Sequence, residues 1–146
     1  MIIQLLLSST LICTLPSDPF YRSDLTAYLT CHKVETQLRT VAIWRPLVDI
    51  YFKEEDVNKA LMIIYCESKG KPTAVGVNKD GTKDVGLWQF NDNTWAWLKG
   101  KLGFTSPRTN PVLSTKVAKW LIYNDGWYHW NSSKHCWGII ENIKEA

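Results

Sequence analysis

The sequence predicts an α+β protein that is mainly α-helical and carries one small β-hairpin. Apolar residues recur at helical spacing along most of the chain, whereas apolar and polar residues alternate only between Ala74 and Phe90. The chain has 146 residues, of which 45% are hydrophobic and 21% charged. This length and composition are enough for one domain with a single buried core.

The first half of the chain is expected to form successive helices. Ser23 or Asp24 caps a first helix that runs toward Thr40. The segment TVAIWRPLVDIYF continues helically, and Pro46 marks either a break or a helix start. The acidic run KEED begins the next helix, where the helix dipole favours negative charge, and Gly70 ends it.

The middle of the chain contains the hairpin and one helix after it. Val75 and Val77 alternate with other residues, and the following NKDG is a hairpin-turn signal. Asn91 or Asp92 then caps a helix that carries Trp95 and Leu98. We expect Gly100 and Gly103 to end this helix, because glycine is a poor helix former and a common helix terminator.

The C-terminal part is expected to be helical again. Asn110-Pro111 is a cap followed by a first-turn proline, and Gly126 ends the helix that they begin. The tail GWYHWNSSKHCWGIIENIKEA adds aromatic residues and a short final helix. Eight tryptophans predict an aromatic core and, beside it, a groove for flat or sugar-like ligands.

The charge balance limits the class of partner. The net charge is +3, from 17 basic and 14 acidic residues that form no basic stripe. This does not favour nucleic-acid binding and is compatible with an anionic partner such as a cell wall.

The first residues, MIIQLLLSSTLICTLPSDP, are uncharged up to Asp18. Their apolar part is short for a transmembrane helix, which needs about 20 residues. We expect residues 1–19 to be either an export signal or a retained apolar anchor, and residues 20–146 to form the domain.

Glu67 and Asp84 are the candidate catalytic acids. Glu67 shares a helix face with Ala60 and Ile64 and lies at the helix end. Burial and the negative helix C-terminus both raise the pKa of such a carboxyl, as a general acid requires. Asp84 lies on the return strand near Gly86, where an open polar setting keeps it ionised. The alternatives are a glutamate that reaches solvent from a helix end and an aspartate that stabilises a turn.

The segment Glu67–Asn91 resembles the active-site segment of the c-type lysozymes, in which Glu-Ser ends a helix and NxDGSTDYGxxQIN follows. The second part here reads NKDGTKDVGLWQFN, and the two acids have the family's separation of 17 residues. The pattern ESKGKPTA followed by GLWQF also resembles lytic transglycosylases of the lysozyme superfamily, as does YNDG at 123–126. The tail GWYHWNSSKHCW resembles the ending of small phage and actinobacterial lysozyme-like domains. The resemblance covers roughly Trp44 to Trp137 and implies a lysozyme-like fold with the hairpin beside an active-site groove.

The resemblance assigns roles to individual residues. Glu67 corresponds to the catalytic acid and Asp84 to the second carboxylate. Ser68 corresponds to a hydroxyl that orients the acid or its neighbours. The other implied substrate-binding residues are the groove-lining Gln89, the tyrosine beside the acid, Tyr123, and the sugar-stacking Trp88 or Trp127. For Gln89 the alternative is a structural amide, and for Tyr123 and the tryptophans it is core packing.

Four cysteines, Cys13, Cys31, Cys66 and Cys136, allow three complete pairings and are too few for the disulfide set of c-type lysozymes. We favour Cys66–Cys136, because each lies beside a motif that should converge on one site. The alternative is that all four are reduced and buried.

The resemblance implies cleavage of the β-1,4 bond between N-acetylmuramic acid and N-acetylglucosamine in peptidoglycan glycan strands. The acid separation and the DGTKD loop favour hydrolysis by a muramidase, whereas ESKGKP and YNDG favour a lytic transglycosylase that uses Glu67 alone. A third reading is a non-catalytic glycan-binding or virion structural protein.

No cofactor is expected. His32, His129 and His135 lack metal-ligand spacing, and the last two are expected to be structural or at the groove rim. We expect the protein to be virion-associated or exported to the cell wall or periplasm, where other virion or secretion-complex proteins are candidate partners.

Overall fold

The computed structural model describes Cys13 and residues 22–143. The helices are α1 (Arg22–Thr40), α2 (Arg45–Tyr51), α3 (Glu54–Ser68), α4 (Asp92–Leu102), α5 (Pro111–Asp125) and α6 (Lys134–Trp137). Short 3-10 helices are η1 (Ala42–Trp44), η2 (Trp127–Ser133) and η3 (Gly138–Asn142). The strands β1 (Val75–Val77), β2 (Lys83–Val85) and β3 (Phe90–Asn91) form an antiparallel sheet in the order β1-β2-β3. The predicted mainly helical α+β class is confirmed.

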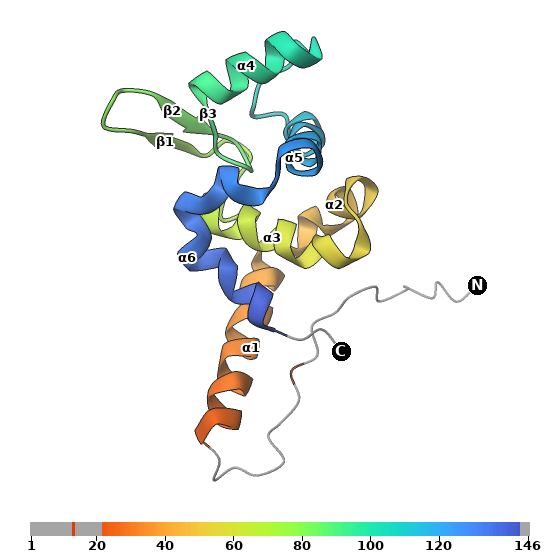
Figure 1. The fold of residues 1–146 in the computed structure, drawn as a ribbon, viewed down its shortest axis with the longest axis vertical. Coiled ribbons are helices and arrows are strands. Elements are labelled where there is room, and N and C mark those ends of the chain that lie inside the picture. Colours follow the sequence, from red (N-terminus) through yellow and green to blue (C-terminus); the bar gives the residue numbers. More distant parts are fainter. Residues whose placement is uncertain (1–12, 14–21, 144–146) are drawn as a thin grey trace, which may run out of the picture.

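Helix α3 is the central element of the described fold. Five consecutive residues, Ala60 to Ile64, are 0% exposed, so the helix is buried on all sides in its middle turns. Figure 1 shows α3 between α2 and α6, with the long α1 extending away from the other helices. Three acidic residues occupy the first turn of α3, where the helix dipole favours them.

Several predicted helix ends are present. Asn91 caps α4 by accepting a hydrogen bond from the Asn93 N–H, and Asn110 caps α5 by accepting one from the Leu113 N–H. Pro46 stands in the first turn of α2 and is therefore a helix start rather than a break.

Other predicted helix ends are displaced. Helix α1 begins at Arg22, so Ser23 and Asp24 lie inside its first turn rather than at a cap position, and α3 ends at Ser68, two residues before Gly70. Helix α4 passes through Gly100 and ends at Gly103, whose φ of +72° supplies the left-handed C-cap. A single glycine in a helix costs about 1 kcal/mol but keeps its backbone N–H, so the hydrogen-bond ladder can continue through it.

The sheet contains the predicted hairpin and one strand more. Strands β1 and β2 pair with Gly76 opposite Asp84, and β3 pairs with β2 so that Asn91 lies on the other side of Asp84. Strand β3 has only two residues, too few to show an alternating pattern, which is why the sequence did not reveal it.

Arg108 joins the sheet to α4. Its guanidinium donates to the carbonyl of Phe90 (2.8 Å) and to the Asp92 carboxylate (2.6 Å). Its own carbonyl lies 2.4 Å from the position a Cβ on Gly86 would occupy, and Gly86 has a φ of +92°. Only glycine fits this point, where the chain leaves β2.

Aromatic residues form part of the buried core. Trp88 is 0% exposed, stacks on Phe52 at 5.6 Å, and donates its indole N–H to the Thr115 hydroxyl. Trp130 donates its indole N–H to the Trp88 carbonyl, so the polar atom of each indole has a partner in the core.

Two disulfides are present in the described residues. Cys66 is joined to Cys136 and Cys13 to Cys31. Apart from Cys13, the predicted apolar segment 1–19 lies outside the described residues. Among the helices that the structure describes, none combines the length and the apolar character that crossing a bilayer requires.

Candidate active site

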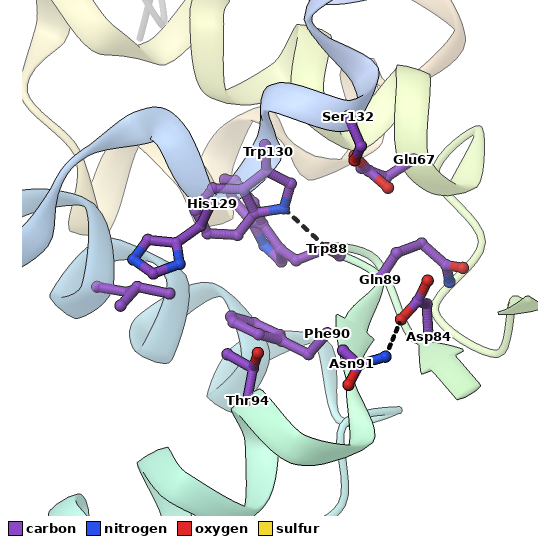
Figure 2. A pocket seen from close by; sticks show the side chains of 11 residues that line it. Glu67, Asp84, Trp88, Gln89, Phe90, Asn91, Thr94, His129, Trp130 and Ser132 are labelled. Atoms are coloured by element: carbon purple, nitrogen blue, oxygen red, sulfur yellow. Dashed lines mark hydrogen bonds between the residues drawn. The ribbon is translucent and has the colours of Figure 1, made fainter. Parts of the chain in front are cut away.

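A pocket brings both predicted carboxylates together. It opens between the C-terminal end of α3, the sheet and η2 (Figure 2). Its lining consists of Glu67, Asp84, Trp88, Gln89, Phe90, Asn91, Thr94, Leu121, His129, Trp130 and Ser132.

Glu67 enters the pocket from the last turn of α3 and is partly buried. The Ser133 hydroxyl donates a hydrogen bond to Glu67 Oε1 at 2.5 Å. Burial raises the pKa of Glu67 above its ordinary value; the Ser133 hydrogen bond acts against this, and the negative charge of Asp84 adds to it. The net result is a carboxyl that retains its proton to higher pH than an exposed glutamate.

Asp84 enters the same pocket from β2 and stands in a more polar setting. Asn91 Nδ2 donates to its Oδ1 at 2.9 Å, and Asn78 Nδ2 donates to its Oδ2 at 3.1 Å. Figure 2 shows the bond from Asn91 and the Asp84 side chain beside Gln89. Each carboxylate oxygen keeps further acceptor capacity, so these amides hold the group in place while leaving it able to face a ligand.

Hairpin register produces this arrangement. Asp84 pairs with Asn91 across β2 and β3, so their side chains share one face of the sheet. Asn78 reaches the Asp84 carboxylate from the hairpin turn. The Thr82 hydroxyl oxygen accepts hydrogen bonds from the side-chain amides of both Asn78 and Asn91.

Gln89 lines the pocket, but its amide nitrogen is directed into the protein. It donates to the carbonyls of Ala74 and Gly86, at 3.0 and 2.9 Å. Gln89 itself has a φ of +50°, so this side chain stabilises the turn that leads into β3.

Ser68 does not line the pocket or orient Glu67. Its side chain is buried, and its hydroxyl bonds to the carbonyls of Ile64 and Leu87 while accepting from the Gly70 N–H. Ser68 therefore ties the end of α3 to the loop before β3, so of its two predicted roles the hydrogen bonds support the orienting of neighbouring residues and not that of the acid itself. Successive helix residues point about 100° apart, so the neighbour of a pocket residue need not face the pocket.

Tyr123 does not lie beside Glu67. Its hydroxyl donates to the Asp56 carboxylate at 2.7 Å and accepts from the Lys53 N–H. Both partners are at the N-terminal end of α3, whereas Glu67 is at the other end, about 16 Å along the helix axis from Asp56. Burial, with smaller contributions from the Asp56 hydrogen bond and nearby acids, raises the pKa of Tyr123 to about 12.

Neither predicted sugar-stacking tryptophan is available for that role. Trp88 is 0% exposed, so no sugar can lie on its ring. Trp127 is partly buried and does not line the pocket, and Lys59 Nζ lies over its ring, 4.5 Å from the centroid. Core packing, the alternative for both, accounts for their positions.

The sequence reasoning missed Ser133. Ser133 lies 66 residues from Glu67 and just outside the pocket lining. It belongs to the C-terminal tail, whose resemblance to lysozyme-like domains depends on glycine, tryptophan and cysteine and does not include a serine. One signal could have found it: Cys66 precedes Glu67 directly, and Ser133 lies one helical turn before Cys136, the partner of Cys66.

His129 occupies the wall of the pocket on η2 and was expected only as structural or at the rim. Its Nε2 lies 2.7 Å from the Asp125 carboxylate, which also accepts from the Tyr128 hydroxyl. These contacts orient the imidazole, which Figure 2 shows across the pocket from Asp84.

The described residues offer one grouping of metal-ligand types, Cys13, His32 and Glu35. Cys13 is in a disulfide, so it supplies no thiolate to an ion. The grouping shares no residue with the pocket.

The fold and this pocket define a lysozyme-like domain. The chain belongs to the transglycosylase SLT domain family, which it matches over residues 51–127, just over half of its length.

Two insect proteins are similar to the chain. A lysozyme of Bombyx mori is 29% identical over 105 residues, which cover 65% of this chain and 75% of that protein. Lysozyme P of Drosophila melanogaster is 25% identical over 131 residues, covering 81% of this chain and 93% of the relative. No solved structure matches the chain.

Proposed function

We propose that the protein is a peptidoglycan-cleaving glycosidase, a muramidase that hydrolyses the β-1,4 bond between N-acetylmuramic acid and N-acetylglucosamine. One observation carries this proposal: two carboxylates in different environments line a single pocket. One acid that keeps its proton and one held by amide donors are what glycoside hydrolysis requires. This arrangement of two carboxylates is the one found in lysozyme.

Glu67 acts as the general acid in this mechanism. Its raised pKa lets it hold a proton and deliver it to the oxygen of the leaving sugar. Asp84 then stabilises the positive charge that develops on the sugar ring, or bonds to its anomeric carbon. A water molecule, deprotonated by the Glu67 carboxylate, completes the hydrolysis and returns the proton to Glu67.

A lytic transglycosylase is the second candidate, and the family match favours it. In that reaction Glu67 protonates the leaving oxygen and then takes the proton of the muramic 6-hydroxyl, which attacks the anomeric carbon. The product is a 1,6-anhydro sugar, and Asp84 has no chemical step. The two reactions therefore differ in their dependence on Asp84.

Purified peptidoglycan digested with the protein, with Glu67→Gln and with Asp84→Asn separates these candidates. We expect muropeptides with reducing ends, a loss of about 10²–10⁴-fold in rate for Glu67→Gln, and a large loss for Asp84→Asn. Products lighter by one water, about 18 Da, that persist in Asp84→Asn would establish the transglycosylase instead, since hydrolysis adds that water. Absence of release by the wild-type protein would refute both and leave a glycan-binding or structural role.

This activity places the protein where peptidoglycan is accessible. We propose export to the cell wall or periplasm, or association with a virion. The two disulfides are consistent with an oxidising compartment.

A further inference from the structure

Ser133 holds its hydroxyl between two acceptors. Its Oγ is 2.5 Å from Glu67 Oε1 and 3.1 Å from the carbonyl oxygen of Trp130. A hydroxyl has one proton, so it donates to one of these acceptors at a time, while its lone pairs can accept from another donor.

The two acceptors suit the two charge states of Glu67. When Glu67 is ionised, Ser133 donates to the carboxylate. When Glu67 is protonated, its own O–H can donate to Ser133 Oγ, and Ser133 donates to the Trp130 carbonyl. That carbonyl also accepts the Trp137 indole N–H at 2.9 Å, and its two lone pairs allow both bonds.

Both ends of this contact are held by the fold. Cys136, one helical turn after Ser133, is disulfide-bonded to Cys66, which directly precedes Glu67. Trp130 is buried, with its indole bonded to the Trp88 carbonyl. The hydroxyl can therefore rotate while its two acceptors remain in place.

We propose that Ser133 is a positioning residue whose single proton turns from the Trp130 carbonyl to Glu67 each time Glu67 loses its proton. No covalent bond of Ser133 forms or breaks; its O–H rotates and exchanges one hydrogen-bond acceptor for the other. The inference rests on the proposed function, because glycosidic cleavage requires Glu67 to give up a proton and recover it. Ser133 lies outside residues 51–127, so this contact is not part of the segment that defines the family.

The proposal predicts a direction for the titration of Glu67. Removing the hydroxyl removes a donor that favours the ionised form, so the pKa of Glu67 rises. The other titratable groups lining the pocket are Asp84 from β2 and His129 from η2, with Asp125 behind His129.

On α6, which packs on α3, two further charged or titratable groups need to be considered. Lys134 is directed at Glu141, with its Nζ 3.8 Å from the carboxylate, and His135 is exposed. The side-chain hydrogen bonds that Ser133 donates go to Glu67 and Trp130 rather than to these groups.

The test is a carbon-13 NMR titration of the Glu67 carboxyl carbon, assigned by its absence in Glu67→Gln. Ser133→Ala should shift the protonation equilibrium about tenfold toward the acid, the size expected for a lost hydrogen bond to a charged group. Ser133→Thr and Ser133→Val form a pair of matched shape in which only threonine keeps the hydroxyl. Glu67 should titrate in Ser133→Thr as it does in the wild type, and in Ser133→Val as it does in Ser133→Ala. The threonine and valine pair therefore still tests the proposal if Ser133→Ala does not fold.

The pH profile of muropeptide release gives the functional readout. General-acid catalysis requires protonated Glu67, so activity falls as the pH rises through its pKa. This fall should occur at higher pH in Ser133→Ala, whereas Ser106→Ala, at an exposed serine that does not line the pocket, should leave its position unchanged. A structural role for Ser133 would lower activity at every pH without moving this fall.

The outcomes separate the inference from the proposed function. An unchanged Glu67 titration in both Ser133→Ala and Ser133→Val overturns the inference even if the protein cleaves peptidoglycan. A shifted titration in a protein that releases no muropeptides overturns the proposed function, and with it the role of Ser133 as a positioning residue in catalysis. A shift in both readouts supports the inference.

Discussion

Replacing both Cys66 and Cys136 by alanine is expected to lower the free energy of unfolding by about 4 kcal/mol. The disulfide joins residues 70 apart in sequence, and closing a loop of that length removes conformational entropy from the unfolded chain. The chain-entropy relation gives about 3 kcal/mol for a 15-residue loop and about 4.7 kcal/mol for 100 residues, and this loop falls toward the upper end.

The Cys13–Cys31 disulfide provides a matched control. It joins residues 18 apart, so the corresponding double variant should lose about 3 kcal/mol, roughly 1 kcal/mol less. Only Cys66–Cys136 adjoins Glu67, so we expect activity under folding conditions to fall in the first variant and to persist in the second.

Urea unfolding under non-reducing conditions, followed by tryptophan fluorescence, measures both stabilities. Muropeptide release by the folded variants supplies the second comparison. If the Cys66/Cys136 variant lost less than about 1 kcal/mol, or no more than the control, the loop-closure reasoning would be refuted. Equal activity of the two variants would show that the disulfide does not hold Glu67 in position.

Three further predictions concern single residues. Burial raises the pKa of Glu67 above 4.5 in the folded protein, so its ionisation destabilises the fold as the pH rises. Glu67→Gln should therefore gain stability relative to wild type between pH 4.5 and neutrality, as measured by thermal unfolding across pH; a constant difference would contradict this. Tyr123→Phe should cost about 1–2 kcal/mol in urea unfolding through the lost hydrogen bond to Asp56, with no shift of the activity–pH profile. Gly86→Ala should cost several kcal/mol, because its Cβ would lie 2.4 Å from a backbone carbonyl, whereas Gly81→Ala meets nothing within 4 Å and should cost about 1 kcal/mol; similar losses would refute the steric argument.

The catalytic candidates were predictable because their placement is largely local. Glu67 follows an apolar helical run and Asp84 follows a hairpin turn, so short-range rules put one at a helix end and the other on a strand. The two acids are only 17 positions apart, and the turns between them leave little freedom in how the two meet.

The residues that were assigned wrong roles are those whose role depends on the direction of the side chain in the packed fold. Trp88 stands between pocket residues in sequence but turns its ring into the core, onto Phe52. Ser68 follows Glu67 directly but faces Leu87, and Tyr123 bonds to the opposite end of α3. Periodicity describes faces of an element, whereas these orientations are set by neighbouring elements.

The sequence by itself therefore determined the mainly helical class, the helix cap at Asn110, a second cap at Asn91 or Asp92, and the pair of acids that defines the candidate site. Only the tertiary structure decided what surrounds those acids. The donors to Asp84 come from the turn and from a two-residue strand, and the donor to Glu67 comes from Ser133, 66 residues away. Local rules act over a few residues through backbone geometry, while contacts at this separation exist only after the core and the disulfide bring the tail onto α3.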